Sequence, residues 1–583
     1  MTFAILSLLL AAASPDSARL HALLEEIWQE SLRESPLSAS EAGDRRYDDR
    51  MPSVGPADRE RRRAARQAFL TRLEAIPRPG LEAEDQVSLE MALLALRNDA
   101  ADDRYGLHRL PLQAEAGFHS MLTRLPATTP LRTVSDYEKY ITRLRGFRPY
   151  FDQQIENMRE GMRTGFTQPR AVLDGFDTTI APHAVDDVEK SAFFAPFRAL
   201  PDTIPAAEQE RLRAQGRAAV AESVLPAFRT LLSFFRGEYL PGARATTGAA
   251  DLPEGRGLYA YLVRRHTTLD VTPEEVHRVG LGEVERIRRE MEEVIRAVGF
   301  QGDFAAFLKF LRTDPRFYAK TPEALLKEAS AIAKRMDGKL PGLFATLPRL
   351  PYGVEPVPPD IAPRYTSGRY VPGAADGTRA GTYWVNTHAL ESRPLYNLEA
   401  LTLHEAVPGH HLQVARSQEL THLPAFRRHE YVTAFGEGWG LYSERLGLEA
   451  GFYKDPYSNF GRLTYEMWRA CRLVVDTGLH ALGWSREKAR DYLASNTALP
   501  LHEVQTEIDR YISWPGQALA YKMGELKIRA LRAEAEKELG ASFDVRAFHD
   551  VVLGSGSVPL SVLERTVRAW IGARRAAAGR PGS

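Results

Sequence analysis

A short segment in the second half of the chain places three histidines beside a glutamate. It reads His404-Glu405-Ala406-Val407-Pro408-Gly409-His410-His411. Zinc enzymes hold their ion with neutral imidazoles and a third ligand, and they leave one coordination position for water. They also place a base beside that water. The segment therefore predicts a site for one Zn²⁺ per chain, with Glu405 as the general base.

The spacing of the histidines departs from the usual arrangement, in which two ligands lie four residues apart on one helical face. The fourth residue after His404 is Pro408, which cannot bind metal. In a regular helix, His410 would be rotated by about 240° from His404, and His411 would lie about 10 Å further along the axis. Pro408 removes a backbone donor and Gly409 permits unusual torsions, so we expect a bulge that makes His410 the second ligand. His411 is the alternative ligand, or a histidine that binds substrate.

The third ligand is expected from the following helix. Glu437 stands between two glycines, where the backbone can approach an ion closely. Glu444 follows seven residues later on the same helical face and could hydrogen-bond a ligand histidine. The predicted metal ligands are thus His404, His410 and Glu437. Three histidines within eight residues, beside a glutamate and a Pro-Gly break, are difficult to explain by packing alone.

Two further side chains are candidates for catalysis. A developing oxyanion needs a donor besides the ion, and Tyr521, near the start of a helix predicted over 517–539, is the first candidate. An ordinary buried tyrosine is an equally good interpretation. His480 follows Asp476 by four residues, so Asp476 could orient the imidazole as a proton donor. A purely structural Asp–His pair is the other interpretation.

Substrate could also be bound by cations and by a strand near the predicted site. The terminal carboxylate of a peptide could pair with one of four cations: Arg510, Lys522, Arg469 or Arg472. Each of them could equally be a surface or structural cation. The predicted strand that contains 383–386 could pair with an extended substrate by strand addition, or form a structural hairpin.

The elements that must position these residues are mostly helices, as the apolar periodicity indicates. The predicted helices span 16–35, 57–75, 84–97, 134–165, 206–237, 273–298, 322–336 and 517–539. Prolines interrupt the pattern between 340 and 386, where two short strands are predicted over 367–371 and 381–386. The predicted fold is therefore mainly α, with a small β element before the metal-binding helix. We expect an N-terminal helical lobe (14–340) and a catalytic lobe (341–583), although a single helical body with a cleft fits equally well.

Composition excludes several other functions. The 583 residues carry 76 Lys and Arg and 76 Asp and Glu, so no basic surplus indicates nucleic acid or an anionic membrane as partner. The single cysteine, Cys471, allows neither an intrachain disulfide nor a cysteine-based zinc site. It stands in an apolar helical stretch and is expected to be a buried small hydrophobe.

The first residues resemble a secretory leader. Phe3 to Ala13 is an uninterrupted apolar run that ends in three alanines, which predicts a signal peptide over 1–13 and a periplasmic or secreted protein. The lack of Lys or Arg before the run argues against a leader, and a core helix is the alternative. No cysteine follows the run, so no lipid anchor is expected there. No later segment is expected to cross a membrane, so stable membrane insertion after leader cleavage is not predicted.

Together, the segment 404–413 and the run 437–444 resemble the bacterial family known as domain of unknown function 885. That family is grouped with the gluzincin-type metallopeptidases, so the resemblance implies a gluzincin-like helical body. The runs 272–277 and 515–522 belong to it as well. Glu437-Gly438 is similar to the Asn-Glu-Gly element of aminopeptidase N-like enzymes, whose glutamate binds zinc. Dipeptidyl peptidase III also has widened histidine spacing, which implies that such a bulge is compatible with catalysis.

The sequence therefore predicts a zinc-dependent hydrolase that cleaves peptide bonds of short peptides. In this mechanism Glu405 takes a proton from the attacking water and passes it to the leaving amine. The preference for short peptides is an analogy from a two-lobed helical body. One alternative is a zinc amidase that acts on non-peptide amide conjugates. Another is a non-catalytic periplasmic binding protein, against which the retained base argues.

Overall fold

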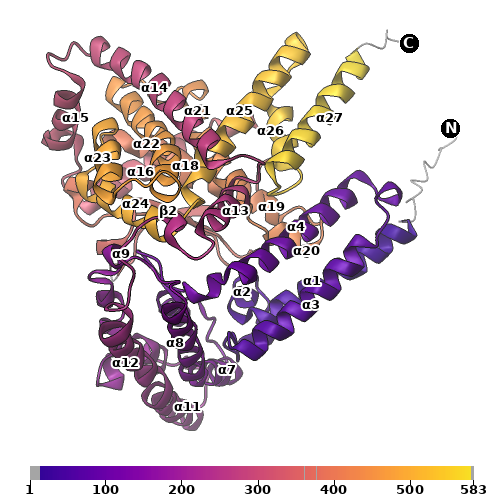
Figure 1. The fold of residues 1–583 in the computed structure, drawn as a ribbon, viewed down its shortest axis with the longest axis vertical. Helices are drawn as coiled ribbons and strands as arrows, with labels where there is room; N and C mark the ends of the chain where they lie inside the picture. The colour runs from indigo at the N-terminus through magenta and orange to yellow at the C-terminus, as the bar shows by residue number, and fades with distance from the viewer. Residues whose placement is uncertain (1–13, 360, 376, 579–583) are drawn as a thin grey trace.

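The structure is a computed structural model that describes residues 14–359, 361–375 and 377–578. Helices make up most of it (Figure 1), as the sequence predicts. The predicted signal peptide, 1–13, lies outside the described residues.

The N-terminal helices extend as an arm at one side of the molecule (Figure 1). The arm consists of α1 (Pro15–Glu34), α3 (Pro56–Glu74) and α4 (Ala83–Tyr105). A small apolar core of its own, which includes Leu23, Leu73 and Leu93, holds these helices together. All three were predicted, but α4 continues past the expected end at Arg97 and stops where Gly106 takes a left-handed conformation (φ 71°).

A second group of helices lies below this arm in Figure 1. It contains α7 (Val134–Arg145), α8 (Phe147–Arg163), α11 (Ala206–Ala219) and α12 (Leu225–Phe234). The single helix predicted over 134–165 is therefore two helices, separated at Gly146. The run Ala206–Tyr239 is long and apolar enough to cross a membrane, which was not expected, but 56% of its most apolar window is buried inside the protein. Phe228 and Leu231 of this run belong to the main core.

The body of the molecule combines helices from both sides of the predicted boundary at 340. From the first half come α13 (Gly255–Thr267), α14 (Pro273–Ala297), α15 (Phe304–Thr313) and α16 (Pro322–Asp337). α14 begins with a capping box between Thr272 and Glu275 and packs along α22 (Pro456–His480). One main core includes residues from both predicted lobes. The division into two lobes stays a prediction.

A three-stranded sheet lies beside these helices. Its order is β1 (Tyr352–Pro356), β3 (Gly381–Val385), β2 (Gly368–Val371), with β1 parallel and β2 antiparallel to β3. The two predicted strands are confirmed, whereas β1 was not predicted, because the surrounding prolines obscure the strand pattern. Because β3 is paired on both sides, the prediction that 383–386 pairs with substrate is wrong. β2 is an edge strand.

The remaining helices follow the sheet in the chain. They are α18 (Leu398–Glu405), α19 (His410–Gln418), α20 (Ala425–His429), α21 (Thr433–Glu449), α22, α23 (Arg486–Asn496), α24 (Leu501–Ser513), α25 (Ala520–Leu539), α26 (Val545–Leu553) and α27 (Leu560–Ala578). α21 packs closely against α25, where a Cβ on Gly438 would lie 2.5 Å from the backbone of Gly524. Cys471 of α22 is fully buried, as predicted.

Candidate metal centre

The histidine-rich segment forms two helices rather than one bulged helix. α18 ends at Glu405, α19 begins at His410, and the Val407–Pro408 peptide between them is cis. Gly409 passes so close to α18 that a Cβ there would lie 1.9 Å from the carbonyl oxygen of His404. Because of this break, the ring of His410 lies beside that of His404, with the ring centroids 4.7 Å apart and the ring planes at 89° to each other.

The break and α21 together bring the three predicted ligands to one point. Ligand atoms of His404, His410 and Glu437 all lie within 4.8 Å of one another. Oε2 of Glu437 is 3.6 Å from Nε2 of His404 and 3.4 Å from Nε2 of His410. Ligands bound at about 2.0–2.2 Å to a tetrahedral zinc ion lie about 3.3–3.6 Å apart, so this donor set fits such an ion.

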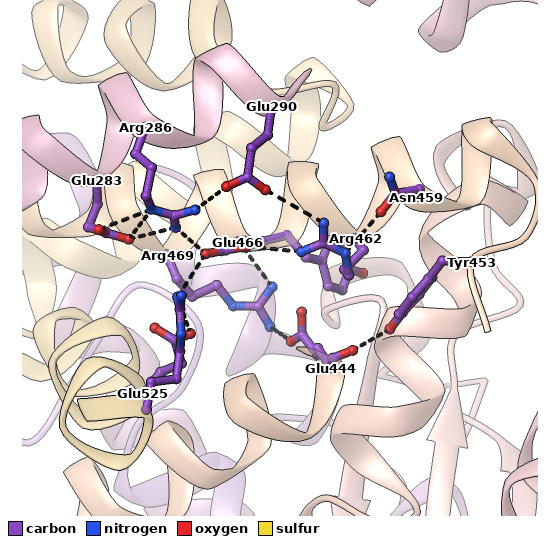
Figure 2. Close-up of polar contacts among 12 residues, drawn as sticks. Glu283, Arg286, Glu290, Glu444, Tyr453, Asn459, Arg462, Glu466, Arg469 and Glu525 are labelled. Carbon is purple, nitrogen blue, oxygen red and sulfur yellow. Dashed lines mark hydrogen bonds and ion pairs between the residues drawn. The ribbon is translucent and has the colours of Figure 1, made fainter. Parts of the chain in front are cut away.

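Glu444 holds the imidazole of His404 from behind. Its Oε1 is 2.8 Å from Nδ1 of His404 and 3.1 Å from Nη2 of Arg469. The hydroxyl of Tyr453 donates to the backbone oxygen of Glu444 (2.7 Å). Figure 2 shows Arg469 and Tyr453 converging on Glu444. With Nδ1 bonded to a carboxylate, Nε2 of His404 is the nitrogen directed at the ligand cluster.

The electrostatics of the cluster favour a cation. Burial opposes a charge on His404, but hydrogen bonds to Glu437 and Glu444 outweigh it and raise the pKa of His404 to about 9. Burial also opposes the charge on Glu437, but hydrogen bonds from His404 and His410 hold its pKa well below the usual range. The carboxylates thus attract a proton when no other cation is bound. A divalent ion would replace that proton and neutralise the same charge.

The expected base lies next to the ligands and is fixed by the sheet. Glu405 is the last residue of α18, is 8% exposed, and is close enough to His404 for its charge to act on that imidazole. Its Oε2 accepts a hydrogen bond from the backbone N–H of Tyr370 on the edge strand β2 (2.7 Å). The sheet therefore positions the base rather than offering its central strand to a substrate.

Two tyrosines border the ligand cluster. The ring of Tyr521 stacks 6.4 Å from that of His404, and the guanidinium of Arg472 lies 4.2 Å from the Tyr521 ring centroid. Tyr431, which the sequence analysis missed, lies 6.3 Å from the ring of His410 and is 41% exposed. Its ring packs on Gly436, where a Cβ would lie 2.4 Å away, and that glycine beside Glu437 was the only signal in the sequence.

His411 does not face the ligand cluster. Its Nδ1 is 3.1 Å from the hydroxyl of Tyr370, its ring lies 4.6 Å from that of Tyr352, and it is 2% exposed. Burial lowers the pKa of His411 to about 4. The predictions of His411 as an alternative ligand or a substrate-binding residue are therefore wrong. The break in the helix turns adjacent histidines to opposite sides.

His480 and Asp476 do not form the predicted pair. Nδ1 of His480 accepts from the N–H of Ala249, and Nε2 donates to the oxygen of Tyr511, both at 3.0 Å. Asp476 instead accepts from the hydroxyl of Tyr259 (2.5 Å) and the N–H of Gly516 (3.1 Å). Burial lowers the pKa of His480 to about 3, so the imidazole is neutral and structural. The prediction of a catalytic proton donor is wrong.

The predicted substrate-binding cations are engaged within the protein. Lys522 is fully buried among three carboxylates, Glu283 (2.9 Å), Glu466 (3.0 Å) and Glu525 (3.0 Å). Figure 2 shows that Glu466 also joins Arg286 and Arg462 in this network. The prediction that Lys522 binds substrate is therefore wrong.

The predicted arginines are likewise held by internal partners. Arg510 is 9% exposed and bonds to Glu507 and Gln517. Arg472 pairs with Glu507 at 2.8 Å, and Arg469 pairs with Glu444. The prediction of Arg510 as a substrate-binding residue is not supported, because its guanidinium is already occupied.

A cavity of about 400 Å³ adjoins the centre at Tyr431. Apolar side chains form part of its wall: Leu94, Leu110, Leu262 and Trp514. Polar groups complete it: Asp102, Arg265, His266 and Glu430. Of the residues that line it, Tyr431 borders the ligand cluster, and the volume is within the range of small-molecule sites.

The fold and the site define a large, mainly helical protein with a candidate centre for one divalent ion. The chain belongs to the family DUF885, described as a bacterial protein of unknown function, which it matches over residues 36–567. It is similar in structure to a protein of Colwellia psychrerythraea described as a "putative lipoprotein", with 30% identity and a TM-score of 0.91 over 96% of this chain and 100% of that chain.

A second solved structure shares the fold. It comes from Shewanella oneidensis and is described as a "putative lipoprotein of unknown function", with 17% identity and a TM-score of 0.72 over 95% of this chain and 99% of that chain. At this identity the likeness concerns the fold alone. No curated protein matches the chain.

Proposed function

We propose that this protein is a zinc-dependent, gluzincin-like hydrolase that cleaves amide bonds of short peptides. One observation carries the proposal. The ligand atoms of His404, His410 and Glu437 lie close enough together to bind one ion, and the carboxylate of Glu405, fixed by a hydrogen bond from β2, is adjacent. A protein that only bound metal would not need a further carboxylate held beside the ligands.

Each residue of the site has a separate role in the proposed reaction. The ion held by the three ligands would polarise the scissile carbonyl and lower the pKa of a water molecule. Glu405 takes the proton of the attacking water and delivers it to the leaving amine. The rings of Tyr521 and Tyr431 border the ligand histidines, and their hydroxyls are the candidate donors to the oxygen that becomes negatively charged.

The decisive experiment measures bound metal and hydrolysis of a mixed peptide library side by side. We expect one zinc per chain in the wild type and in Glu405→Gln, because Glu405 is not a ligand. Loss of the base should lower the turnover number of Glu405→Gln by about 10²- to 10⁴-fold. Full activity of Glu405→Gln with zinc bound would disprove the role of the base.

His410→Ala and His411→Ala form a matched pair for the ligand assignment. His410→Ala should lose both zinc and activity, whereas His411→Ala should keep zinc, because its side chain faces the sheet. Circular dichroism verifies that both variants are folded. A wild type that neither binds metal nor cleaves any peptide would make the protein a binding protein instead.

For its location, we propose a protein of the cell envelope outside the cytoplasm. The two solved structures named above are described as putative lipoproteins, and the apolar run 3–13 has the length of a signal-peptide core. Sequencing the amino terminus of the protein from its native host tests this, because cleavage near Ala13 is expected and a retained Met1 would contradict export.

A further inference from the structure

One arginine beside the candidate centre has no hydrogen-bonding or ion-pairing partner among the described residues. Arg369 lies on the edge strand β2 and its side chain is exposed. Among the residues that the structure describes, it forms no hydrogen bond and no ion pair through its guanidinium. Its guanidinium instead makes a cation–π contact with Tyr365, whose ring centroid lies 5.3 Å from the guanidinium carbon. Five N–H donors are therefore free to bind a ligand.

The position of Arg369 ties it to the proposed chemistry. The next residue, Tyr370, donates its N–H to Glu405, so the strand that fixes the base also carries Arg369. The charges of Glu405 and Tyr521 both act on the guanidinium, which places it at the edge of the same site. Residues along a strand are separated by about 3.3 Å, so the backbone of Arg369 lies one residue from the amide that holds Glu405.

The surroundings of Arg369 hold it in place. Trp384 is its cross-strand partner, so the two side chains lie on the same face of the sheet. The rings of Tyr365 and Trp384 meet edge to face, with centroids 6.0 Å apart. The guanidinium of Arg369 thus lies over the ring of Tyr365, and Trp384 packs against that ring. A planar guanidinium oriented in this way matches the geometry of a carboxylate.

The other arginines near Tyr521 cannot perform this role. Arg472 and Arg510 share Glu507, and Arg469 is paired with Glu444. Glu115 lies near Arg369, but no direct ion pair joins them, and burial raises the pKa of Glu115. Of the described arginines near Tyr521, Arg369 is therefore the one that a carboxylate from solvent can bind. The exposed Arg124, whose guanidinium lies 5.7 Å from the ring centroid of Trp384, is a second guanidinium beside the same aromatic pair.

We propose that Arg369, with Tyr365 and Trp384, binds a carboxylate of the substrate next to the scissile bond. This proposal rests on the proposed hydrolase function and specifies the end of the peptide that is cleaved. Peptides with a free carboxyl terminus are preferred, and one or two residues are released from that end. The same chemistry would recognise an acidic side chain at this position, and the experiment separates the two sources.

The experiment uses peptides in three matched forms: a free carboxyl terminus, a terminal amide, and a terminal amide with glutamate as the last residue. Hydrolysis by the zinc-loaded protein and calorimetric binding to the metal-free protein are measured for each form. Wild type should prefer the free acid. Arg369→Ala should raise KM and Kd for that form about 10- to 100-fold, with little effect on the amide and a smaller effect on kcat.

Two variants serve as controls. Arg369→Lys keeps the charge without the planar fork and should restore part of the affinity. Arg379→Ala removes an exposed arginine between β2 and β3 and should change neither KM nor Kd. Thermal unfolding should show the same midpoint for all of them, because both side chains are exposed.

Each result separates the two proposals. The wild type could hydrolyse the free acid and the glutamyl amide equally well, and Arg369→Ala could hydrolyse neither. That result would assign the bound carboxylate to a side chain. Equal binding of all three forms by the wild type, or equal weakening of all three in Arg369→Ala, overturns the role of Arg369. Cleavage of the peptides would still support the hydrolase. Binding that depends on Arg369 without any cleavage would overturn the hydrolase and keep the carboxylate site.

Discussion

Glu444 sets the properties of a ligand histidine although it lies outside the ligand cluster. It is 1% exposed and accepts the Nδ1 proton of His404, which directs Nε2 toward Glu437 and His410. Arg469 supplies the counter-charge that a buried carboxylate needs. A carboxylate partner of this kind also increases the basicity of the imidazole that binds the metal.

Glu444→Gln therefore tests this arrangement at the level of a single residue. The amide keeps a hydrogen-bond acceptor but loses the charge, so we expect zinc affinity to fall about 10- to 100-fold. Competition with a chromophoric chelator measures the affinity. Glu449→Gln, near the end of the same helix and away from the cluster, should leave it unchanged. Equal affinities for Glu444→Gln and the wild type would contradict the role of Glu444.

At the scale of elements, the site depends on close approaches that only glycine allows. On α21, Glu437 belongs to the ligand cluster, Glu444 bonds to His404, and Gly440 between them lies under the ring of His404. The break between α18 and α19 needs Gly409 for the same reason, since its Cα lies against the backbone of His404. Backbone geometry therefore places the ligands as much as the ligand side chains do.

Gly440→Ala should displace His404. The added Cβ would lie 2.6 Å from the ring, whose neighbours leave it little space to move. We expect a loss of stability of about 1–3 kcal/mol and a clear loss of zinc affinity, measured by urea unfolding and chelator competition. Gly282→Ala in α14 is the matched control: its Cβ meets nothing within 4 Å, and it should stabilise slightly. Unchanged zinc affinity in Gly440→Ala would disprove the steric argument.

For the whole molecule, buried histidines outside the ligand cluster determine the response to acid. Burial lowers the pKa to about 3 for each of His119, His266, His480 and His549. In the unfolded chain these groups titrate near 6.5, so below that pH the unfolded state binds protons that the folded state does not. The free energy of unfolding then falls by up to about 1.4 kcal/mol per pH unit for each histidine.

The largest opposing shifts are those of two buried carboxyls. Burial raises the pKa of Asp476 to about 7 and that of Glu503 to about 6, so both add stability as they take up protons on acidification. Together with His411, whose pKa burial lowers to about 4, the four histidines outweigh these two carboxyls, and the net effect between about pH 6 and 4.5 is a loss of stability.

Urea unfolding midpoints at pH 7.5, 6.0 and 5.0 test this expectation. The midpoint should fall toward pH 5.0, and His480→Asn should show a weaker dependence on pH than the wild type, even if it is less stable overall. His422→Asn, at an exposed histidine, should keep the dependence of the wild type. A midpoint that rises on acidification would contradict the assignment of neutral buried histidines.

The sequence by itself determined the features that depend on nearby residues. Helix starts at Thr272 and Thr321 were readable because a capping side chain acts within one turn. The chemical types of the three ligands were readable too, because a histidine or a glutamate can bind a metal wherever it stands. The Pro-Gly break indicated that His410, six residues from His404, could still reach the same point.

Only the tertiary structure decided which groups are free and which are occupied. Lys522 and Arg472 have the charge to bind a carboxylate, but helices distant in sequence place carboxylates against both. Arg369 and Tyr431 carry no motif, yet chain packing leaves them at the site. Burial and pairing arise between distant segments, so local sequence patterns do not encode them. For this reason the type of centre was predictable, and the residues that border it were not.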